Sequence, residues 1–466
     1  MAKAKRKVAT RKKPPARKKA AARGNGAAVD TNLLNDLLRW ARDAGADAAD
    51  AYVAESAQLS VGIRLGVREK LERSESRDLS LRVFIGKRMA IVSSTDFDPA
   101  SLKALAGRAT AMARVVPEDP YCGLAPEDRI ARDWPELDLD DGKEASVATL
   151  QDWCQRAEDA ARAVKGVTNS EGANAGWSGG RVALAASNGF AGEYRYGSYG
   201  IDVSVLAGEG VGMERDYDWS QAVYADDLDK PETLGRNAGR GAVKRLNPRK
   251  IKSGRYPVIY DRRVSGGMLG HLAGAINGRS IARQTSFLLD KLGKQVFSKG
   301  LRVVDDPHRR RKSGSRPFDG EGLPTKRMNL IEDGKLTTWL LDLNSARQLG
   351  MQPTGHGAWG GGPTTSNLYL EKGQESVKSL IGDIRRGLFI SDLIGFGVNG
   401  VTGDYSRGAS GFWIEKGELA WPVSGVTVAG NLKNMFRHIT PASDLQFKSS
   451  TNAPTLRIDG MTIAGE

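Results

Sequence analysis

Four glycines inside one helical pattern constrain the fold of this chain more than any other feature. The stretch from Tyr256 to Phe287 opens with a short apolar strand at 257–260, after which apolar residues recur at helical spacing. The apolar positions are Val264, Met268, Leu269, Leu272, Ala275 and Ile276, and the glycines are Gly266, Gly267, Gly270 and Gly274. Each glycine costs about 1 kcal/mol relative to alanine in a helix. We therefore predict a helix over 262–277 that another part of the backbone approaches closely.

The remaining patterns predict an α+β protein with three folded units. Residues 29–115 read as an N-terminal antiparallel sheet with helices, in which Leu59 to Val67 alternates between apolar and polar residues. Residues 116–142 are rich in Pro and Asp and read as a linker, and residues 143–250 read as a second α+β unit. From 251 to 466, short strands separated by glycine turns predict a β-rich, barrel-like domain that contains the central helix.

The first 28 residues form a segment of a different kind. Residues 1–24 hold eleven Lys and Arg residues and no acid, so the rest of the chain carries only +3 of the net charge of +14. Residues 1–28 have almost no large apolar side chains, so we expect a disordered tail. The tail is either a solvated extension or a contact to nucleic acid or another polyanion through phosphates.

Cysteine usage and hydropathy indicate the compartment. Cys122 and Cys154 are isolated and lie in no metal-binding spacing, which fits a reducing environment. No apolar run is long enough to span a membrane, and the N-terminus lacks the apolar core of a secretory signal. We expect a cytoplasmic protein that does not enter a membrane.

Few residues suggest chemistry. No two of the four histidines lie within ten residues of each other, so the sequence predicts no local metal site. His271, on the predicted helix, reads as a packed histidine rather than a ligand or catalyst. Asp319 and Glu321 lie in a glycine turn and are either turn formers or an acid/base pair. Asp404 and Arg407 could form a buried pair, and the glycines that follow them suit a groove for an extended peptide equally well as the closure of a barrel.

Several blocks resemble the TldD/PmbA family of metallopeptidases. They are Asp319-Gly-Glu-Gly, the run from Gly397 to Glu415 containing GDYSRGASGFW, Ala420–Val423, Val428–Leu432 and Gly460–Gly465. The catalytic TldD branch carries His-Glu-x-x-x-His on the helix that matches 262–277, and its histidines hold zinc. Here that motif falls on 270–275 or 269–274, and both histidine positions are lost. The catalytic branch also has a cysteine near the C-terminus, where residues 446–455 contain none.

The resemblance is therefore to the PmbA branch, also called TldE, which lacks the metal ligands. It implies a heterodimer in which a TldD-like partner supplies zinc, this chain holds no cofactor, and flexible or modified peptides are cleaved. Two other functions stay open. One is a stand-alone protein that binds peptides or polyanions, and such a chain could form a homodimer when it is alone. The other is a metal-free hydrolase that uses Asp319 or Glu321.

Overall fold

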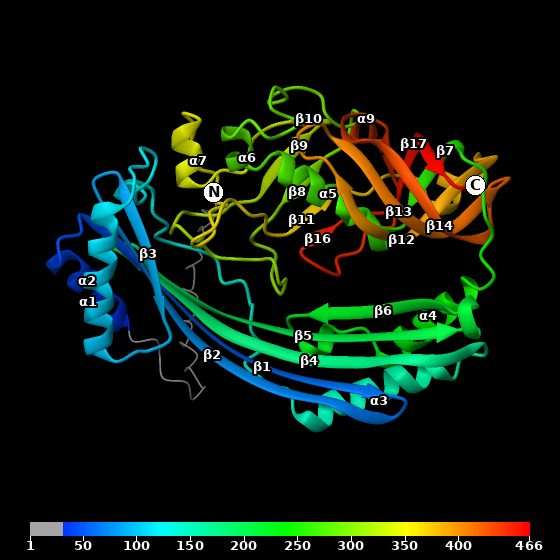
Figure 1. The fold of residues 1–466 in the computed structure, drawn as a ribbon, viewed down its shortest axis with the longest axis horizontal. Coiled ribbons are helices and arrows are strands. Elements are labelled where there is room, and N and C mark those ends of the chain that lie inside the picture. Colours follow the sequence, from blue (N-terminus) through cyan, green and yellow to red (C-terminus); the bar gives the residue numbers. More distant parts are fainter. Residues whose placement is uncertain (1–30) are drawn as a thin grey trace, which may run out of the picture.

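The computed structural model describes residues 31–466, so the tail predicted over 1–28 lies outside the described residues. Figure 1 shows two parts, a long curved sheet and a β-rich domain that lies above it. The sheet is antiparallel, in the order β3-β2-β1-β4-β5-β6. Its strands are β1 (Ala48–Arg64), β2 (Val67–Ile85), β3 (Arg88–Ser94), β4 (Val167–Ala186), β5 (Ala191–Ala207) and β6 (Glu214–Ala222).

One strand pairing joins the two predicted N-terminal units. β1 pairs with β4 from Asp50↔Ala186 to Ile63↔Ala173, so strands from 29–115 and 143–250 belong to a single sheet. Residues 116–142, predicted to be a linker, contain no strand among them and only one short 3-10 turn, at Glu127–Arg129.

The strands are longer than the apolar alternation indicates. Leu59, Val61 and Ile63 are buried on one face, as predicted, but Leu65 adopts a φ of 51° in the turn to β2 and is exposed, as is Val67. The alternation at 59–67 therefore covers only the last part of a longer strand, β1, which begins at Ala48 and ends at Arg64. In the middle of β1, the face that no helix covers is polar. A search for apolar alternation therefore does not detect the full length of the strand.

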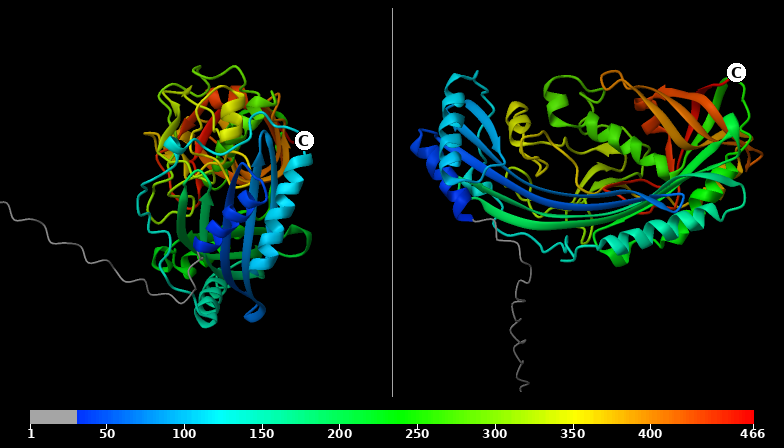
Figure 2. Two further views of the ribbon diagram at one scale, coloured as in Figure 1. Left: turned by 90° about the vertical axis from the view of Figure 1, so that its left-hand side faces the viewer. Right: turned by 60° about the horizontal axis from the view of Figure 1, so that its bottom comes forward.

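Four helices cover the other face of the long sheet (Figure 2). These are α1 (Thr31–Asp43) and α2 (Pro99–Val115) at one end, and α3 (Val147–Arg162) and α4 (Pro231–Lys244) at the other. In α4, a Cβ at Gly235 or Gly239 would collide with the backbone of α3. The close approach that glycine permits therefore occurs between these two helices.

The C-terminal part is the predicted barrel-like domain with a central helix. The strands β14-β13-β12-β7-β17 form a sheet that closes through pairing of β14 with β17, and β15 adds to β17. The barrel strands are β7 (Gly254–Tyr260), β12 (Arg386–Val398), β13 (Asp404–Glu415), β14 (Glu418–Asn431), β15 (Ile439–Pro441) and β17 (Leu456–Ala464).

A second, smaller sheet of five strands packs beside the barrel in the order β10-β9-β8-β11-β16. Its strands are β8 (Val303–Asp305), β9 (Met328–Glu332), β10 (Lys335–Leu336), β11 (Leu368–Leu370) and β16 (Thr451–Asn452). Helix α5 (Arg262–Ala275) shares one core with both sheets, because Leu272 is buried in the same cluster as Val258 and Leu330. The α+β class and the barrel-like domain around a central helix are thus confirmed.

The remaining helices are short connections in the C-terminal part. They are α6 (Gly278–Ala282), α7 (Leu343–Gln348), α8 (Val377–Gly382) and α9 (Leu432–Arg437). Within residues 31–466, no helix has the length and apolar character needed to cross a membrane.

Candidate functional site

Helix α5 presents a row of glycines to open space. Asp261 caps the helix by accepting the Arg263 N–H at 2.8 Å, and Met268, Leu269 and Leu272 bury the opposite side. A Cβ placed at Gly267, Gly270 or Gly274 would meet no atom within 4 Å outside its own helix turn. Only Gly266 has backbone nearby, with Thr451 O 3.2 Å from the point that a Cβ would occupy. The prediction of close backbone packing is therefore wrong for the three other glycines.

The glycine row faces the long sheet. Residues 263, 267, 270 and 274 recur at helical spacing and lie on one side of α5. Arg263, the first of them, reaches β6, where its guanidinium donates to Asp216 and to Tyr217 O. The open side of α5 is therefore directed to the space between the sheet and the C-terminal domain.

The residues at the positions of the zinc motif do not fit a zinc site. In one register they are Gly270 and Ala275, and in the other Leu269 and Gly274, none of which has a side-chain ligand atom. Across residues 31–466, no group of three or more His, Cys, Asp or Glu side chains is placed to hold a metal ion. We therefore derive no step of the chemistry through a metal on this chain.

His271 is half-buried beside this glycine row. Its ring meets the Tyr405 ring edge to face, with centroids 5.9 Å apart. Burial lowers the pKa of His271 and the nearby Arg407 lowers it further, so the ring is neutral near pH 7. The buried Tyr405 hydroxyl has no hydrogen-bond partner of regular geometry among the described residues. His271 thus packs against a buried ring.

Asp404 and Arg407 do not form the buried pair that the sequence suggested. Residues three apart on a strand point to opposite faces, and the two lie that way on β13. Asp404 is exposed and accepts from Thr402 Oγ1 at 2.7 Å and Asn431 Nδ2 at 3.0 Å, which lowers its pKa. Arg407 lies on the inner face, where its Nε donates to Ile394 O at 3.4 Å.

Asp319 and Glu321 are buried and bonded to backbone amides. Asp319 accepts the N–H groups of Glu321 and Leu323 at 2.9 Å and that of Gly357 at 3.0 Å. Glu321 accepts the N–H of Leu343 at 2.8 Å, at the start of α7. Burial raises the pKa of both carboxyl groups, to about 8 for Glu321, where the neighbouring Asp319 carboxylate adds to the shift. These contacts tie three loop segments together.

The Asp319–Glu321 turn borders an aromatic contact between the sheet and the C-terminal domain, which we call the aromatic junction. Tyr52 of β1 stacks on Trp359 with ring centroids 5.3 Å apart, and the Arg82 guanidinium lies 4.9 Å from the Trp359 ring. Phe318 is enclosed by other rings, which come from Trp134, Phe190 and Tyr194. Arg82 is held in turn by a bidentate pair with the buried Asp50.

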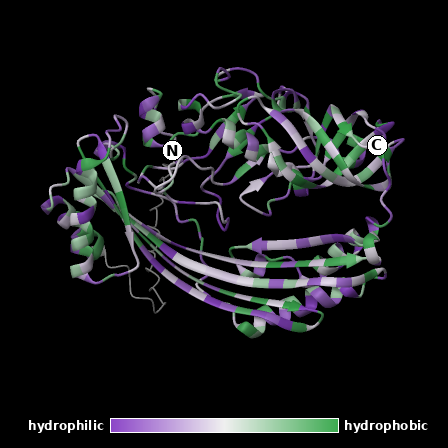
Figure 3. Ribbon diagram, in the orientation of Figure 1, coloured by the Kyte–Doolittle hydropathy of each residue, from purple (hydrophilic) through white to green (hydrophobic). Residues whose placement is uncertain are grey.

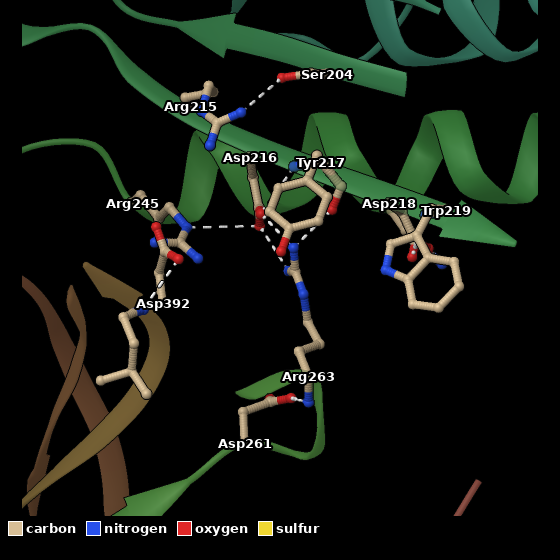
Figure 4. A network of polar contacts seen from close by, with 12 residues as sticks. Ser204, Arg215, Asp216, Tyr217, Asp218, Trp219, Arg245, Asp261, Arg263 and Asp392 are labelled. Atoms are coloured by element: carbon tan, nitrogen blue, oxygen red, sulfur yellow. Dashed lines mark hydrogen bonds and ion pairs between the residues drawn. The ribbon is translucent and has the colours of Figure 1, made fainter. Parts of the chain in front are cut away.

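A second contact, which we call the ionic junction, lies near the other end of the sheet (Figure 4). Asp216 of β6 pairs with Arg245, which follows α4, at 3.5 Å, and with Arg263 of α5 at 2.8 Å. Lys448 of the C-terminal domain pairs with Asp229 at 3.2 Å and Asp218 at 3.8 Å. Sequence reasoning missed both junctions because their residues come from segments far apart in the chain.

Between the two junctions, the face of the long sheet that no helix covers is mostly polar and uncharged. Alternation places this face on the side of Tyr52 and Tyr194, which contact the C-terminal domain. Figure 3 shows the hydropathy alternating along the long strands. A depression of about 520 Å³ lies on this face. Its lining includes Gln58, Ser60, Asn174, Ser178, Ser198 and Gln221.

Comparison with known proteins agrees with this architecture. Three family models match in order: PmbA/TldA metallopeptidase domain 1 at residues 49–113, the central domain at 140–246 and the C-terminal domain at 253–465. Among solved structures, a protein of Bacteroides thetaiotaomicron is 27% identical with a TM-score of 0.87, covering 94% of this chain and 99% of its own. TldE from Thermococcus kodakarensis shares the fold at 21% identity and a TM-score of 0.83, over 93% and 100%.

Two curated relatives carry the name metalloprotease PmbA. The protein of Escherichia coli O157:H7 is 37% identical over 90% of this chain and 93% of its own length. The homologue in Haemophilus influenzae is 35% identical over 92% and 94%. A TldD homologue of Haemophilus influenzae is 26% identical over 57% of this chain and 61% of its own. The chain therefore belongs to the PmbA/TldD metallopeptidase family.

Proposed function

We propose that this chain is the non-catalytic, PmbA/TldE-like subunit of a cytoplasmic metallopeptidase complex and that a TldD-like partner supplies the zinc. The observation that carries the proposal is the open side of α5. At the positions of the zinc motif this chain has only residues without ligand atoms, and Gly267, Gly270 and Gly274 leave that side empty. In the partner, zinc would activate the water that cleaves the peptide.

The wall opposite α5 supports a peptide as the substrate of the complex. Small hydroxyl and amide side chains line the depression on the sheet. Such groups can bond to a peptide main chain without selecting particular side chains. Glycines on the facing helix let a peptide backbone come close. Flexible or modified peptides are therefore the substrate class that we propose.

Co-purification with a TldD-like chain, followed by peptide cleavage, tests the proposal. We expect the two chains to co-elute and to cleave an unfolded peptide only when both are present with zinc. The chain alone should carry no stoichiometric zinc after dialysis, measured by elemental analysis. His271→Ala should leave most of the cleavage by the complex, because that ring only packs against Tyr405.

Three results would contradict this assignment of roles. One is about one zinc ion retained per isolated chain, and another is cleavage by the isolated chain, which would favour a metal-free hydrolase. The third is a loss of cleavage in the His271→Ala complex while the two subunits still assemble. Peptide or polyanion binding without any cleavage in the presence of the partner would favour a stand-alone binding protein.

A further inference from the structure

A polar pocket of about 250 Å³ lies at the ionic junction, between β6, the first turn of α5 and the segment 446–453. Its lining includes two aromatic rings, three cations, one acid and three amides. The rings are Tyr217 and Trp219, the cations Arg262, Arg263 and Lys448, the acid Asp218, and the amides Asn237, Gln446 and Asn452. Pockets between domains are common ligand sites, and this one combines apolar walls with a few polar groups.

The walls of this pocket are held in place by ion pairs. Arg263 donates to both carboxylate oxygens of Asp216, at 2.8 and 3.2 Å, and its guanidinium lies 4.5 Å from the Tyr217 ring. Lys448 lies 3.4 Å from Trp219 O and pairs with Asp229. Two of the three cations are therefore committed to acids of the chain, and they fix the aromatic walls.

Arg262 is the cation that remains. Within residues 31–466 its guanidinium forms no ion pair and no side-chain hydrogen bond, although its charge partly offsets the rise that burial causes in the pKa of the adjacent Asp261. Two acids close to Arg262 already accept other hydrogen bonds. Asp261 caps α5 through the Arg263 N–H, and Asp218 accepts from Asn237 at 2.9 Å. An exposed guanidinium that lines a preformed pocket suits a carboxylate, which it can bind through two parallel hydrogen bonds.

The pocket continues from the depression on the sheet, because Trp219 lines both. The outer edge of β6 is closed at this point. Tyr217 N–H bonds to Asp216 and Tyr217 O to Arg263, while Trp219 N–H bonds to Asp218 and Trp219 O to Lys448. A peptide therefore cannot add to this edge as a further strand, and it reaches the pocket across the polar face of the sheet.

We propose that this pocket binds the free C-terminal carboxylate of an extended peptide, with Arg262 as the carboxylate ligand and Trp219 as the apolar wall. The peptide as ligand class rests on the proposed function. The depression holds the main chain, and the pocket, at its end, holds the terminus. This arrangement sets how a peptide is oriented in the space between the sheet and α5.

Fluorescence anisotropy with labelled pentapeptides on the isolated full-length chain tests this inference. The probes are Gly-Ser-Gly-Ser-Leu with a free acid, the same peptide as an amide, and an amide with an internal Glu. We expect the free acid to bind about tenfold more tightly than either amide, the usual size of one charge-assisted hydrogen bond. Arg262→Met should abolish that preference, and Arg262→Lys should keep part of it.

Arg240→Met is the matched control, because Arg240 is an exposed arginine of α4 outside the pocket and should leave the preference unchanged. Thermal melting checks that each variant is folded. Equal binding of acid and amide to the unaltered chain, or an equal effect of the two methionine variants, would overturn the inference. Tight binding of the Glu-containing amide would show that the terminus itself is not recognised. Co-assembly and zinc-dependent cleavage are measured in separate experiments. The proposed function is therefore tested independently of this binding site.

Discussion

The sheet meets the C-terminal domain at two junctions of opposite chemistry. At the aromatic junction, rings from five segments bury one another, and Phe318 is 3% exposed. At the ionic junction, the contact runs through Asp216, whose side chain is 7% exposed, to two arginines. The first junction is stabilised by the removal of apolar surface from water. The second depends on charges that must stay paired.

This difference separates two tasks. The aromatic junction is held mainly by ring packing, so it can be close-packed and rigid. The ionic junction borders the 250 Å³ pocket, and its ion pairs orient the side chains that line the pocket. We infer that the aromatic junction fixes the angle of the sheet, whereas the ionic junction shapes the pocket that a peptide enters. Substitutions at each can separate these tasks.

The largest effect is expected at the aromatic junction. Phe318→Ala should reduce the free energy of unfolding by about 4 kcal/mol, because it leaves a cavity among three rings. Urea denaturation measures it. Phe396→Ala is the control, since Phe396 is 98% exposed and should change stability by less than about 0.5 kcal/mol. Similar losses in both variants would show that the junction is not closely packed.

A smaller loss is expected from the ionic junction. Asp216→Ala leaves the Arg245 side chain, 8% exposed, without its carboxylate and should cost about 3 kcal/mol. Peptide affinity should fall as well, since Arg263 loses its anchor. Glu171→Ala breaks an exposed pair with Arg215 and should have no measurable effect on either quantity. If peptide affinity is unchanged in Asp216→Ala, the junction does not shape the pocket.

Glu321 should make the aromatic junction sensitive to pH. Its pKa is about 8 in the folded chain and 4.5 as the ordinary value, so the folded state binds the extra proton between these values. The contribution of Glu321 to stability is therefore greatest at low pH and falls as pH rises towards 8, by about 2 kcal/mol between pH 6 and pH 8. Glu321→Gln should remove this slope in urea titrations at several pH values. If stability depends on pH in the same way in the Glu321→Gln variant, another group is responsible for this dependence.

The smallest effect tests the open side of α5. Gly270→Ala should raise the stability of the isolated chain by about 1 kcal/mol, because alanine favours the helix and meets no neighbour. Gly270→Leu should also be tolerated by the isolated chain but should reduce peptide cleavage by the complex if a backbone approaches there. Thermal melting and cleavage assays measure the two quantities. A destabilising alanine would mean that the glycine row is packed after all.

The sequence predicts local elements better than long-range contacts. The capped helix α5, the barrel-like domain and the burial of Leu59, Val61 and Ile63 follow from spacing that is visible in the chain. The full length of β1 and β4 cannot be predicted in this way, because the middle of each strand shows no regular apolar alternation.

The candidate sites show the same limit. The sequence suggested a pair between Asp404 and Arg407 from their proximity, whereas strand geometry places them on opposite faces. Asp319 and Glu321 were identified as candidates, but not their bonds to Gly357 and Leu343. Arg262 gave no signal, because the pocket that it lines is recognised only when its neighbours in space are known.

The pairing of β1 with β4 also determines the order in which the strands can pair during synthesis of the chain. Asp50 meets Ala186, so β1 has left the ribosome long before its central neighbour has been made. Until β4 has been made, the strands of the nascent chain can form only the hairpins β1–β2 and β2–β3. Val61 and Ile63 stay exposed until helix α3 has been made and covers them. An unpaired strand edge beside exposed apolar residues invites aggregation. The emerging N-terminal third is thus the part of this protein that we expect chaperones to shield.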